Sequence, residues 1–348
     1  MRTVRSLLPA TAAVVLTLTA CTQGAAAPAA ETSAEPAEEV PTALEVMAPV
    51  IEEARNMPVR GDVWNLRTDS AEAWGVGPED DRYGVYDIYH SETWSWVDEY
   101  DIGTGRSEGG EEWGLHAQRT DATTWRLLNE DAWAAWERDG SPVRWEPGPE
   151  GERSDIPTQE EDFGEMSGPH PGGWDFGLGT VDHRGLQEAS PDPEDLEEML
   201  FPASEPMPDD PVAQGPDGIR HPSTTGGGHE GEEARRFSYV SRSLHLPFPP
   251  EVRAGMYTLL AGLPGVRPLE AVRDVSGRPA VGVAYTLDPT DIGTVEHRVL
   301  FDPATGWPLS QEHVVVEPAA SAADWCEPGD VVKYTLYEFS MWIDGPPL

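Results

Sequence analysis

Few side chains in this chain are of the types that carry chemistry. The 348 residues include nine histidines, two cysteines and a single lysine, Lys333. His221 and His229 lie close together in a glycine-rich segment that also holds carboxylates, and imidazole and carboxylate groups are ligands that zinc accepts. A run of glycines does not hold such ligands in place before the metal binds, so the sequence predicts no metal site there.

The common catalytic motifs are missing from the sequence. There is no G-x-S-x-G elbow, no H-E-x-x-H helix, no P-loop and no C-x-x-C pair, and Lys333 has no serine or threonine three residues before it. His90, His116 and His297 lie on expected strands, where a histidine is more often a partnered structural residue than a ligand. We therefore expect no catalytic residue and no cofactor. The alternative is a hydrolase with carboxylates as acid and base, but acidic pairs are too common here to single one out.

The charge of the chain excludes one class of partner. There are 63 acidic and 23 basic residues, a net charge of -40. A surface this negative repels nucleic acid, so no nucleic-acid partner is expected. Adaptation to high salt, where charge repulsion is screened, is an alternative reason for the acidity.

The N-terminus predicts export and a lipid anchor. Arg2 and Arg5 precede the apolar run from Leu7 to Leu18, which is typical of a signal peptide. The residues Leu18-Thr19-Ala20-Cys21 that follow resemble the lipobox of bacterial lipoproteins. The resemblance implies cleavage after residue 20, lipid attachment at Cys21 and a location on the outer face of the cytoplasmic membrane. An ordinary secretory cleavage after Ala20 or Ala27 is the alternative.

The rest of the chain divides into a tether and one domain. Residues 21–41, rich in Ala, Pro and Glu, cannot bury a core and predict a flexible tether. Residues 42–348 are expected to form a single domain with flexible acidic inserts near 147–172 and 203–231. Cys326 has no partner for an internal disulfide once Cys21 is lipidated, so we expect it to be buried or free, with a bond to another molecule as the alternative.

Hydrophobic periodicity predicts an α+β fold with strands, then helices, then strands. The first helix should follow Thr42 and Glu45, which have capping-box spacing, with Pro49 kinking or delaying it. A bulge is expected in the last strand at Leu336 and Tyr337, where two apolar residues break the alternation. The expected strands are 63–66, 83–90, 93–100, 113–119, 124–128, 281–287, 295–301, 307–317 and 331–343. The expected helices are 185–200, 232–245 and 250–263, with a short helix or a turn at 129–138.

Aromatic and apolar residues suggest where a ligand would lie. Trp94 and Trp96 are two residues apart and should share one face of a strand. An apolar cavity between sheet and helices would be lined mainly by such side chains, although core packing is the favoured explanation for most of them. The candidates for the cavity are Trp94, Trp96, Trp113, Met256, Leu260 and Tyr285.

Four segments resemble an uncharacterised family of actinobacterial exported proteins. That family is distantly similar to the LolA, LolB and RseB superfamily, whose fold is a curved antiparallel half-barrel closed by helices. Members of the superfamily carry lipids or sense envelope stress and are not enzymes. The resemblance implies a membrane-anchored protein that binds an apolar ligand or an envelope partner protein. The segments are 134–142, 186–200, 246–266 and 300–306.

Overall fold

The computed structural model describes the chain from residue 41 to residue 343 with gaps. The described residues are 41–58, 63–96, 114–142, 167–172, 174–175, 180–181, 183–201 and 231–343, and residues 41–348 form one compact unit. The signal peptide and Cys21, His221 and His229, and most of both expected inserts lie outside these residues. Within the described part, no helix is both long enough and apolar enough to cross a membrane.

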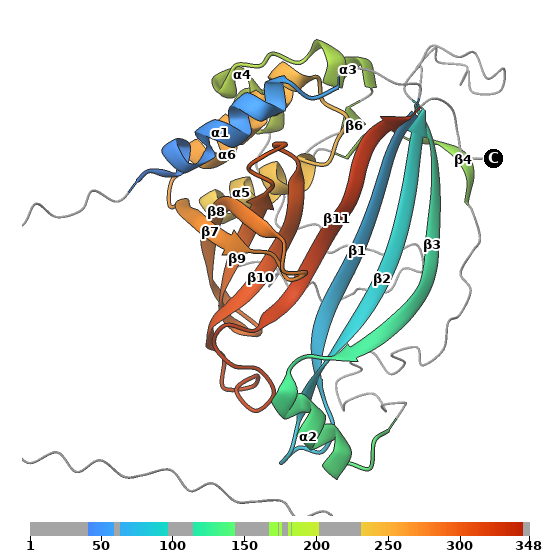
Figure 1. Cartoon of the computed structure of the whole chain (residues 1–348), viewed down its shortest axis with the longest axis vertical. Coiled ribbons are helices and arrows are strands. Elements are labelled where there is room, and N and C mark those ends of the chain that lie inside the picture. The colour runs from blue at the N-terminus through green and yellow to red at the C-terminus, as the bar shows by residue number, and fades with distance from the viewer. Residues whose placement is uncertain are drawn as a thin grey trace, which may run out of the picture. The chain divides into compact units, whose positions relative to one another are not determined.

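A curved, open antiparallel sheet of nine strands is the centre of the fold (Figure 1). Its order is β4-β3-β2-β1-β11-β10-β9-β8-β7. The first and the last strand in the described chain, β1 and β11, are therefore neighbours near the middle of the sheet. A separate ribbon pairs β5 with β6. The strands are β1 (Val63–Val76), β2 (Tyr83–Trp96), β3 (Gly114–Leu127), β4 (Ser167–Gly172), β5 (Trp174–Asp175), β6 (Thr180–Val181), β7 (Arg267–Arg273), β8 (Pro279–Thr290), β9 (Gly293–Phe301), β10 (Pro308–Pro318) and β11 (Val331–Ile343).

Six helices accompany the sheet in the described residues, and the α+β class is confirmed. They are α1 (Ala43–Arg55), α2 (Glu130–Arg138), α3 (His183–Glu188), α4 (Pro193–Leu200), α5 (Glu232–Ser243) and α6 (Pro250–Gly262). The Thr42–Glu45 capping box is formed, and α1 begins directly after it. Pro49 lies inside α1 rather than delaying its start, because the cap and a fully buried face around Met47 and Val50 hold the helix on both sides of it.

One face of the sheet, here called the helix face, packs against α5 and α6. Phe237 of α5 stacks on Tyr285 of β8 at 5.5 Å, and Tyr257 of α6 contacts Phe301 of β9 at 4.7 Å. Met256 of α6 is completely buried in the same core. This core is the largest in the described chain and accounts for most of the apolar burial that stabilises the fold.

A buried arginine ties the helices together beside this core. Arg253 of α6 is 2% exposed and lies against the rings of Trp64 and Trp307, with 5.5 and 5.2 Å from its Cζ to the ring centroids. Its guanidinium donates to the carbonyl oxygens of Leu244 and Leu246, both at 2.8 Å. These hydrogen bonds and ring contacts offset the cost of burying the charge, so Arg253 fixes the connection between α5 and α6.

The opposite face, here called the hairpin face, is partly covered by the turn between β7 and β8. Residues 274–278 of that turn fold back across the sheet and bond to β10. A second core lies on this side, with Tyr86 of β2 packed edge-on against Tyr334 of β11 at 5.6 Å. The two faces therefore differ: helices cover one, and a hairpin tip covers the other.

Several strands are longer than expected. The segments 83–90 and 93–100 were expected as two strands, but β2 runs without a break through Ser91 and Glu92, because β1 pairs with it along its whole length. Of the expected strand 93–100, the structure describes residues 93–96, which form the end of β2. The expected strands 113–119 and 124–128 likewise form one strand, β3, and β7 was not expected at all.

Two other expectations are modified. The bulge in β11 lies at Glu338, which the register with β1 skips, one residue beyond the expected position. Ser167–Gly172, placed in the first flexible insert by the sequence, forms strand β4 at the edge of the sheet. The remainder of that insert and residues 203–230 lie outside the described residues.

Candidate functional site

Polar side chains form a row across the helix face. Residues directly opposite each other on antiparallel strands share a face, and the register places seven residues of seven strands in line. Five of them are titratable groups other than tyrosine. In order across the sheet the row is Tyr285, His297, His313, Lys333, Glu72, Asp87 and Trp125.

The two histidines of this row are buried side by side. Their rings are 4.6 Å apart, and Phe237 of α5 lies edge-on to His297 at 5.0 Å. Burial is the main reason that the pKa of His297 falls to about 3, while Gln311 nearby opposes the shift slightly. Neither ring nitrogen of His297 is in hydrogen-bonding geometry with a described group. Burial and the neighbouring His297 also hold the pKa of His313 well below its usual value, so both rings are neutral.

The charged end of the row is paired rather than reactive. The Lys333 ammonium lies 3.6 Å from a carboxylate oxygen of Glu72, and the Tyr89 hydroxyl donates to Asp87. No group of three or more histidine, cysteine or acidic residues in the described ranges has the arrangement of a metal site. Phe237 of α5 thus covers the Tyr285 and His297 end of the row, and the contact between Lys333 and Glu72 lies toward its other end.

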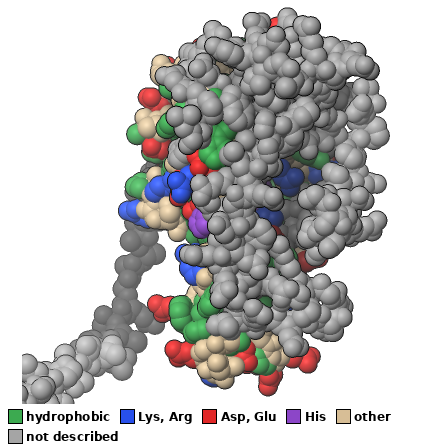
Figure 2. All heavy atoms as spheres, turned by 90° about the vertical axis from the view of Figure 1, so that its right-hand side faces the viewer, with side chains coloured by type: hydrophobic (Ala, Val, Ile, Leu, Met, Phe, Trp, Pro, Cys, Tyr) green, Lys and Arg blue, Asp and Glu red, His purple; other side chains and the backbone are tan. Residues whose placement is uncertain are grey.

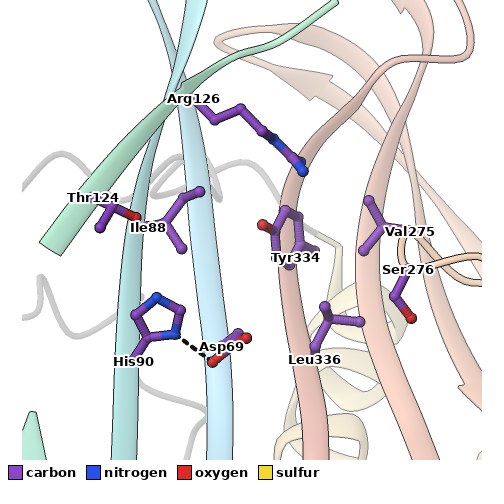
Figure 3. Close-up of a pocket in the computed structure, with 9 residues that line it drawn as sticks. All are labelled: Asp69, Ile88, His90, Thr124, Arg126, Val275, Ser276, Tyr334 and Leu336. Carbon is purple, nitrogen blue, oxygen red and sulfur yellow. Dashed lines mark hydrogen bonds and ion pairs between the residues drawn. The ribbon is translucent and has the colours of Figure 1, made fainter. Parts of the chain in front are cut away.

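A pocket of about 250 Å³ lies on the hairpin face (Figure 3). Strands β1, β2, β3 and β11 supply its floor, and the β7–β8 turn supplies a wall. Apolar side chains alternate with polar ones around it. The lining residues are Asp69, Ile88, His90, Thr124, Arg126, Val275, Ser276, Tyr334 and Leu336.

The pocket has one polar group of contacts at each end. At one end, Nδ1 of His90 lies 2.6 Å from a carboxylate oxygen of Asp69, its directly opposite neighbour on β1. At the other end, the guanidinium of Arg126 lies over the ring of Tyr86, 5.1 Å from its centroid. The hydroxyl of Tyr334 points into the space between them. Burial raises the pKa of Tyr334, Arg126 lowers it and Asp69 raises it, so the hydroxyl remains protonated and able to donate.

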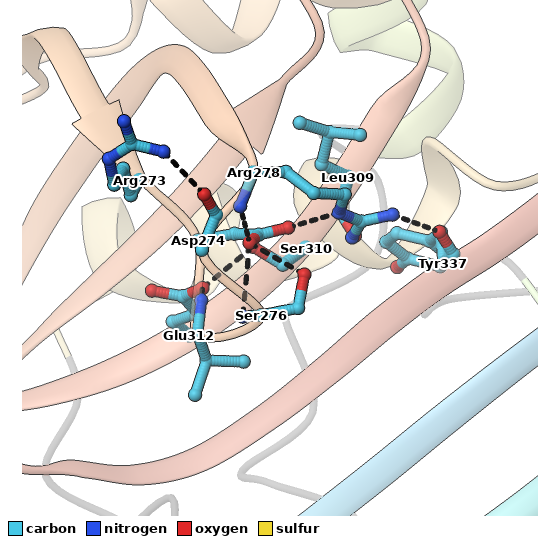
Figure 4. Close-up of polar contacts among 10 residues, drawn as sticks. Arg273, Asp274, Ser276, Arg278, Leu309, Ser310, Glu312 and Tyr337 are labelled. Carbon is cyan, nitrogen blue, oxygen red and sulfur yellow. Dashed lines mark hydrogen bonds and ion pairs between the residues drawn. The ribbon is translucent and has the colours of Figure 1, made fainter.

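A buried carboxylate anchors the wall of the pocket (Figure 4). Glu312 of β10 is 1% exposed and accepts from the backbone N–H of Val275 at 2.8 Å and from the Ser310 hydroxyl at 2.9 Å. Burial raises the pKa of Glu312 more than these hydrogen bonds lower it. Glu312 thus fixes the tip of the β7–β8 turn at Val275, which lines the pocket.

Asp274 and Arg278 shape the same turn. One carboxylate oxygen of Asp274 accepts from the backbone N–H groups of Ser276 and Arg278, at 3.0 and 2.8 Å. Arg278 pairs with Asp274 and also donates to the carbonyl oxygen of Leu309 at 2.8 Å. These bonds hold the turn rigid, so the pocket is formed without a ligand.

The hydrogen-bonded His90 and Asp69 resemble half of a catalytic arrangement. An oriented histidine becomes a general base for a nucleophile only when a hydroxyl or thiol lies within hydrogen-bonding distance of its other nitrogen. In the described residues, the hydrogen bond to Asp69 is the one contact of this kind that His90 makes. The sulfur of Cys326 is not an alternative nucleophile, because burial raises the pKa of its thiol to about 12.

The residues expected to line an apolar cavity lie in three places. Met256 and Leu260 are fully buried in the main core, and Tyr285 packs at its border. Trp94, 6% exposed, lies in a separate small core with Val63 and Ile343. Trp96 follows on β2, and Trp113 lies outside the described residues. None of the four whose surroundings are described lines the hairpin-face pocket, and their role as a ligand cavity stays a prediction.

Of the pocket residues, the sequence singled out His90 but predicted neither its partner Asp69 nor the turn that closes the pocket. His90 was expected to be a partnered strand histidine, and its bond to Asp69 confirms this. Asp69 was missed because β1 was expected to end at Leu66. The spacing of Ile88 and His90, two residues apart on one strand, does predict that their side chains lie on the same face of the sheet. The turn that completes the pocket comes from residues nearly 200 positions later in the chain.

The surroundings are strongly acidic. Figure 2 shows acidic side chains gathered at the end of the molecule where α2 lies. Glu130, Asp131, Glu137 and Asp139 in and after α2 are all exposed. Arg126 is therefore a local positive charge on a chain of opposite sign.

Comparisons with known proteins add no assignment to this geometry. No family model, no curated protein and no solved structure matches the chain.

Proposed function

We propose that this protein is a non-catalytic binding protein or sensor of the cell envelope, with the hairpin-face pocket as its ligand site. The observation that supports binding most directly is the preformed pocket, which combines apolar walls with two polar ends. Binding sites for small molecules have this composition, and 250 Å³ is close to the lower limit of their usual size. A small ligand or one or two side chains of an envelope partner would fill it.

A lipid at Cys21 would hold the folded unit at the outer face of the cytoplasmic membrane. This part of the proposal is supported by the Leu18-Thr19-Ala20-Cys21 sequence. Residues 21–41 would then span roughly 25 Å as a flexible tether. Cys21→Ala should move the protein from the membrane fraction to the medium or leave it unprocessed, and unchanged attachment would contradict the anchor.

The alternative is a hydrolase that uses acidic groups for proton transfer. One observation favours it, which is the orientation of His90 by Asp69 at 2.6 Å. The binding role is preferred because no described hydroxyl or thiol hydrogen-bonds to His90. Hydrolysis of ester substrates that is lost in His90→Ala would reverse this preference.

Retention of a ligand by the purified full chain tests the binding role. Val275→Trp should fill the pocket, since Val275 lines it, while its backbone bond to Glu312 is kept. Val316→Trp, at a position that is 49% exposed outside the pocket, is the matched control. Extraction and mass spectrometry should find a small molecule with the wild type and Val316→Trp but not with Val275→Trp. Equal retention by all three would contradict the site.

A further inference from the structure

Arg126 is one of six arginines whose described side chains pair with no carboxylate in the described residues. Some of the others donate to backbone carbonyl oxygens, as Arg253 does, whereas Arg138 pairs with Asp81 at 2.6 Å. Arg126 makes neither an ion pair nor a hydrogen bond to any described residue, and its contact is with the face of Tyr86. A positive charge in so acidic a protein is thus kept available at the pocket.

The opposite end of the pocket offers acceptors. Asp69 supplies carboxylate oxygens, and its bond to Nδ1 of His90 turns the other ring nitrogen of His90 into the pocket (Figure 3). Arg126 pairs with Tyr86 and Asp69 pairs with His90, so four residues of β2 separate the two ends. At about 3.3 Å per residue this is about 13 Å between backbones, less the reach of the side chains.

The middle of the pocket is apolar. Ile88 lies between the two ends on β2 and Val275 faces it from the turn, while Leu336 of β11 lies opposite Asp69, beside the acceptor end. Tyr334 adds its ring and a hydroxyl that donates. A ligand would therefore meet a cation, a short apolar stretch and an acceptor in that order.

We propose that the pocket binds a short amphiphilic organic acid. Its anionic oxyacid group pairs with Arg126 and the Tyr334 hydroxyl, its apolar body of about six carbons lies on Ile88 and Leu336, and a hydroxyl or ammonium at the far end donates to Asp69. A guanidinium matches the geometry of a carboxylate or a phosphate. The proposal rests on the proposed function, because it names the ligand of that pocket.

The size of the pocket favours a short ligand over a long acyl chain. Its volume of about 250 Å³ lies below the range of roughly 300–1,000 Å³ in which most ligand pockets fall. The acceptor pair Asp69 and His90 also closes the far end with polar atoms, which an unbroken hydrocarbon chain would leave without partners.

Three matched probes separate the parts of the proposal. They are 6-hydroxyhexanoate, with both polar ends, hexanoate, with the anion alone, and 1,6-hexanediol, with hydroxyls alone. Binding to the full chain is followed by the methyl signals of Ile88, Val275 and Leu336 in nuclear magnetic resonance titrations. We expect 6-hydroxyhexanoate to bind about tenfold more tightly than 1,6-hexanediol. Hexyl phosphate in place of hexanoate tells whether the pocket prefers a phosphate to a carboxylate.

Two variants locate the contacts. Arg126→Gln should weaken 6-hydroxyhexanoate about tenfold and leave 1,6-hexanediol unchanged, and Asp69→Asn should remove the advantage of 6-hydroxyhexanoate over hexanoate. Arg138→Gln on α2 removes the same charge outside the pocket and should bind like the wild type. A tenfold change is 1.4 kcal/mol, a modest value that fits a partly exposed contact.

Different results would contradict the proposed acid ligand and the proposed binding function of the pocket. If 1,6-hexanediol shifts the methyl signals as strongly as 6-hydroxyhexanoate and Arg126→Gln changes nothing, the pocket binds ligands but not acids, and this inference is wrong. If no probe shifts the methyl signals and Val275→Trp retains as much co-purified material as the wild type, the pocket is not a ligand site and the proposed function fails as well.

Discussion

Acidification from pH 7 to pH 5 should destabilise the folded unit by about 4 kcal/mol through His297 and His313 alone, because both are buried without charge. Burial lowers the pKa of His297 to about 3 and that of His313 well below its usual value. In the unfolded chain both groups titrate near 6.5. Below that pH the unfolded state binds two protons that the folded state does not, so stability is present above about pH 6.5 and is lost as pH falls.

The magnitude follows from proton linkage. Each group contributes about 1.4 kcal/mol per pH unit below its unfolded pKa, or about 2 kcal/mol at pH 5. Two groups give about 4 kcal/mol, a large share of a typical total of roughly 5–15 kcal/mol. Burial lowers the pKa of His245 to about 4 as well, so His245 adds a further loss of the same order as each of these two groups.

Urea unfolding followed by tryptophan fluorescence at pH 7, 6 and 5 measures this dependence. His297→Gln and His313→Gln should each remove about 2 kcal/mol of it, and the double variant should remove about 4 kcal/mol. The two single variants act as controls for each other, because the residues lie side by side in the same row. A double variant that loses stability with acid as steeply as the wild type would refute the reasoning.

Four further outcomes are expected. Glu312→Gln should steepen the acid dependence, because the raised pKa of Glu312 gives stability at low pH that is lost as pH rises, and unfolding curves will show it. Trp94→Ala should cost about 3–5 kcal/mol in urea unfolding if Trp94 only packs, while Trp133→Ala, 50% exposed, should cost far less. Thr42→Ala should lower stability by about 1 kcal/mol through loss of the capping box, seen in thermal melts. In a Cys21→Ala chain, Cys326 should resist maleimide at pH 7 until urea is added.

Local periodicity was sufficient for much of the fold. The last strand was predicted at 331–343 and forms there, and the helix at 250–263 ends one residue early. These elements alternate or repeat in a way that depends only on nearby residues. Breaks placed at Ser91 and Glu92 were wrong, because pairing with the whole length of β1 overrides their weak strand preference.

The site depends on information that local patterns do not contain. Alternation predicts that Ile88 and His90 share a face, but it does not say that Val275 will be folded against them. That contact requires Glu312, on β10, to be buried where the turn of residues 274–278 arrives. The second half of β1 was not predicted because it contains charged residues such as Asp69. A strand that lines a pocket lacks the regular apolar and polar alternation of a core strand.

The polar groups on the two faces of the sheet have different surroundings. We therefore expect those on the helix face to affect folding stability and those on the hairpin face to affect ligand binding. On the helix face, His297 and His313 are enclosed by α5 and neighbouring strands, and changing their charge acts on folding. On the hairpin face, Arg126 and the pair of Asp69 and His90 remain in contact with a hollow held open by a fixed turn. Substitutions in the row should therefore alter unfolding far more than ligand affinity, and those at Arg126 should do the reverse. A variant of Arg126 that unfolds as readily as the His297 variants would show that the two faces are not separate in this sense.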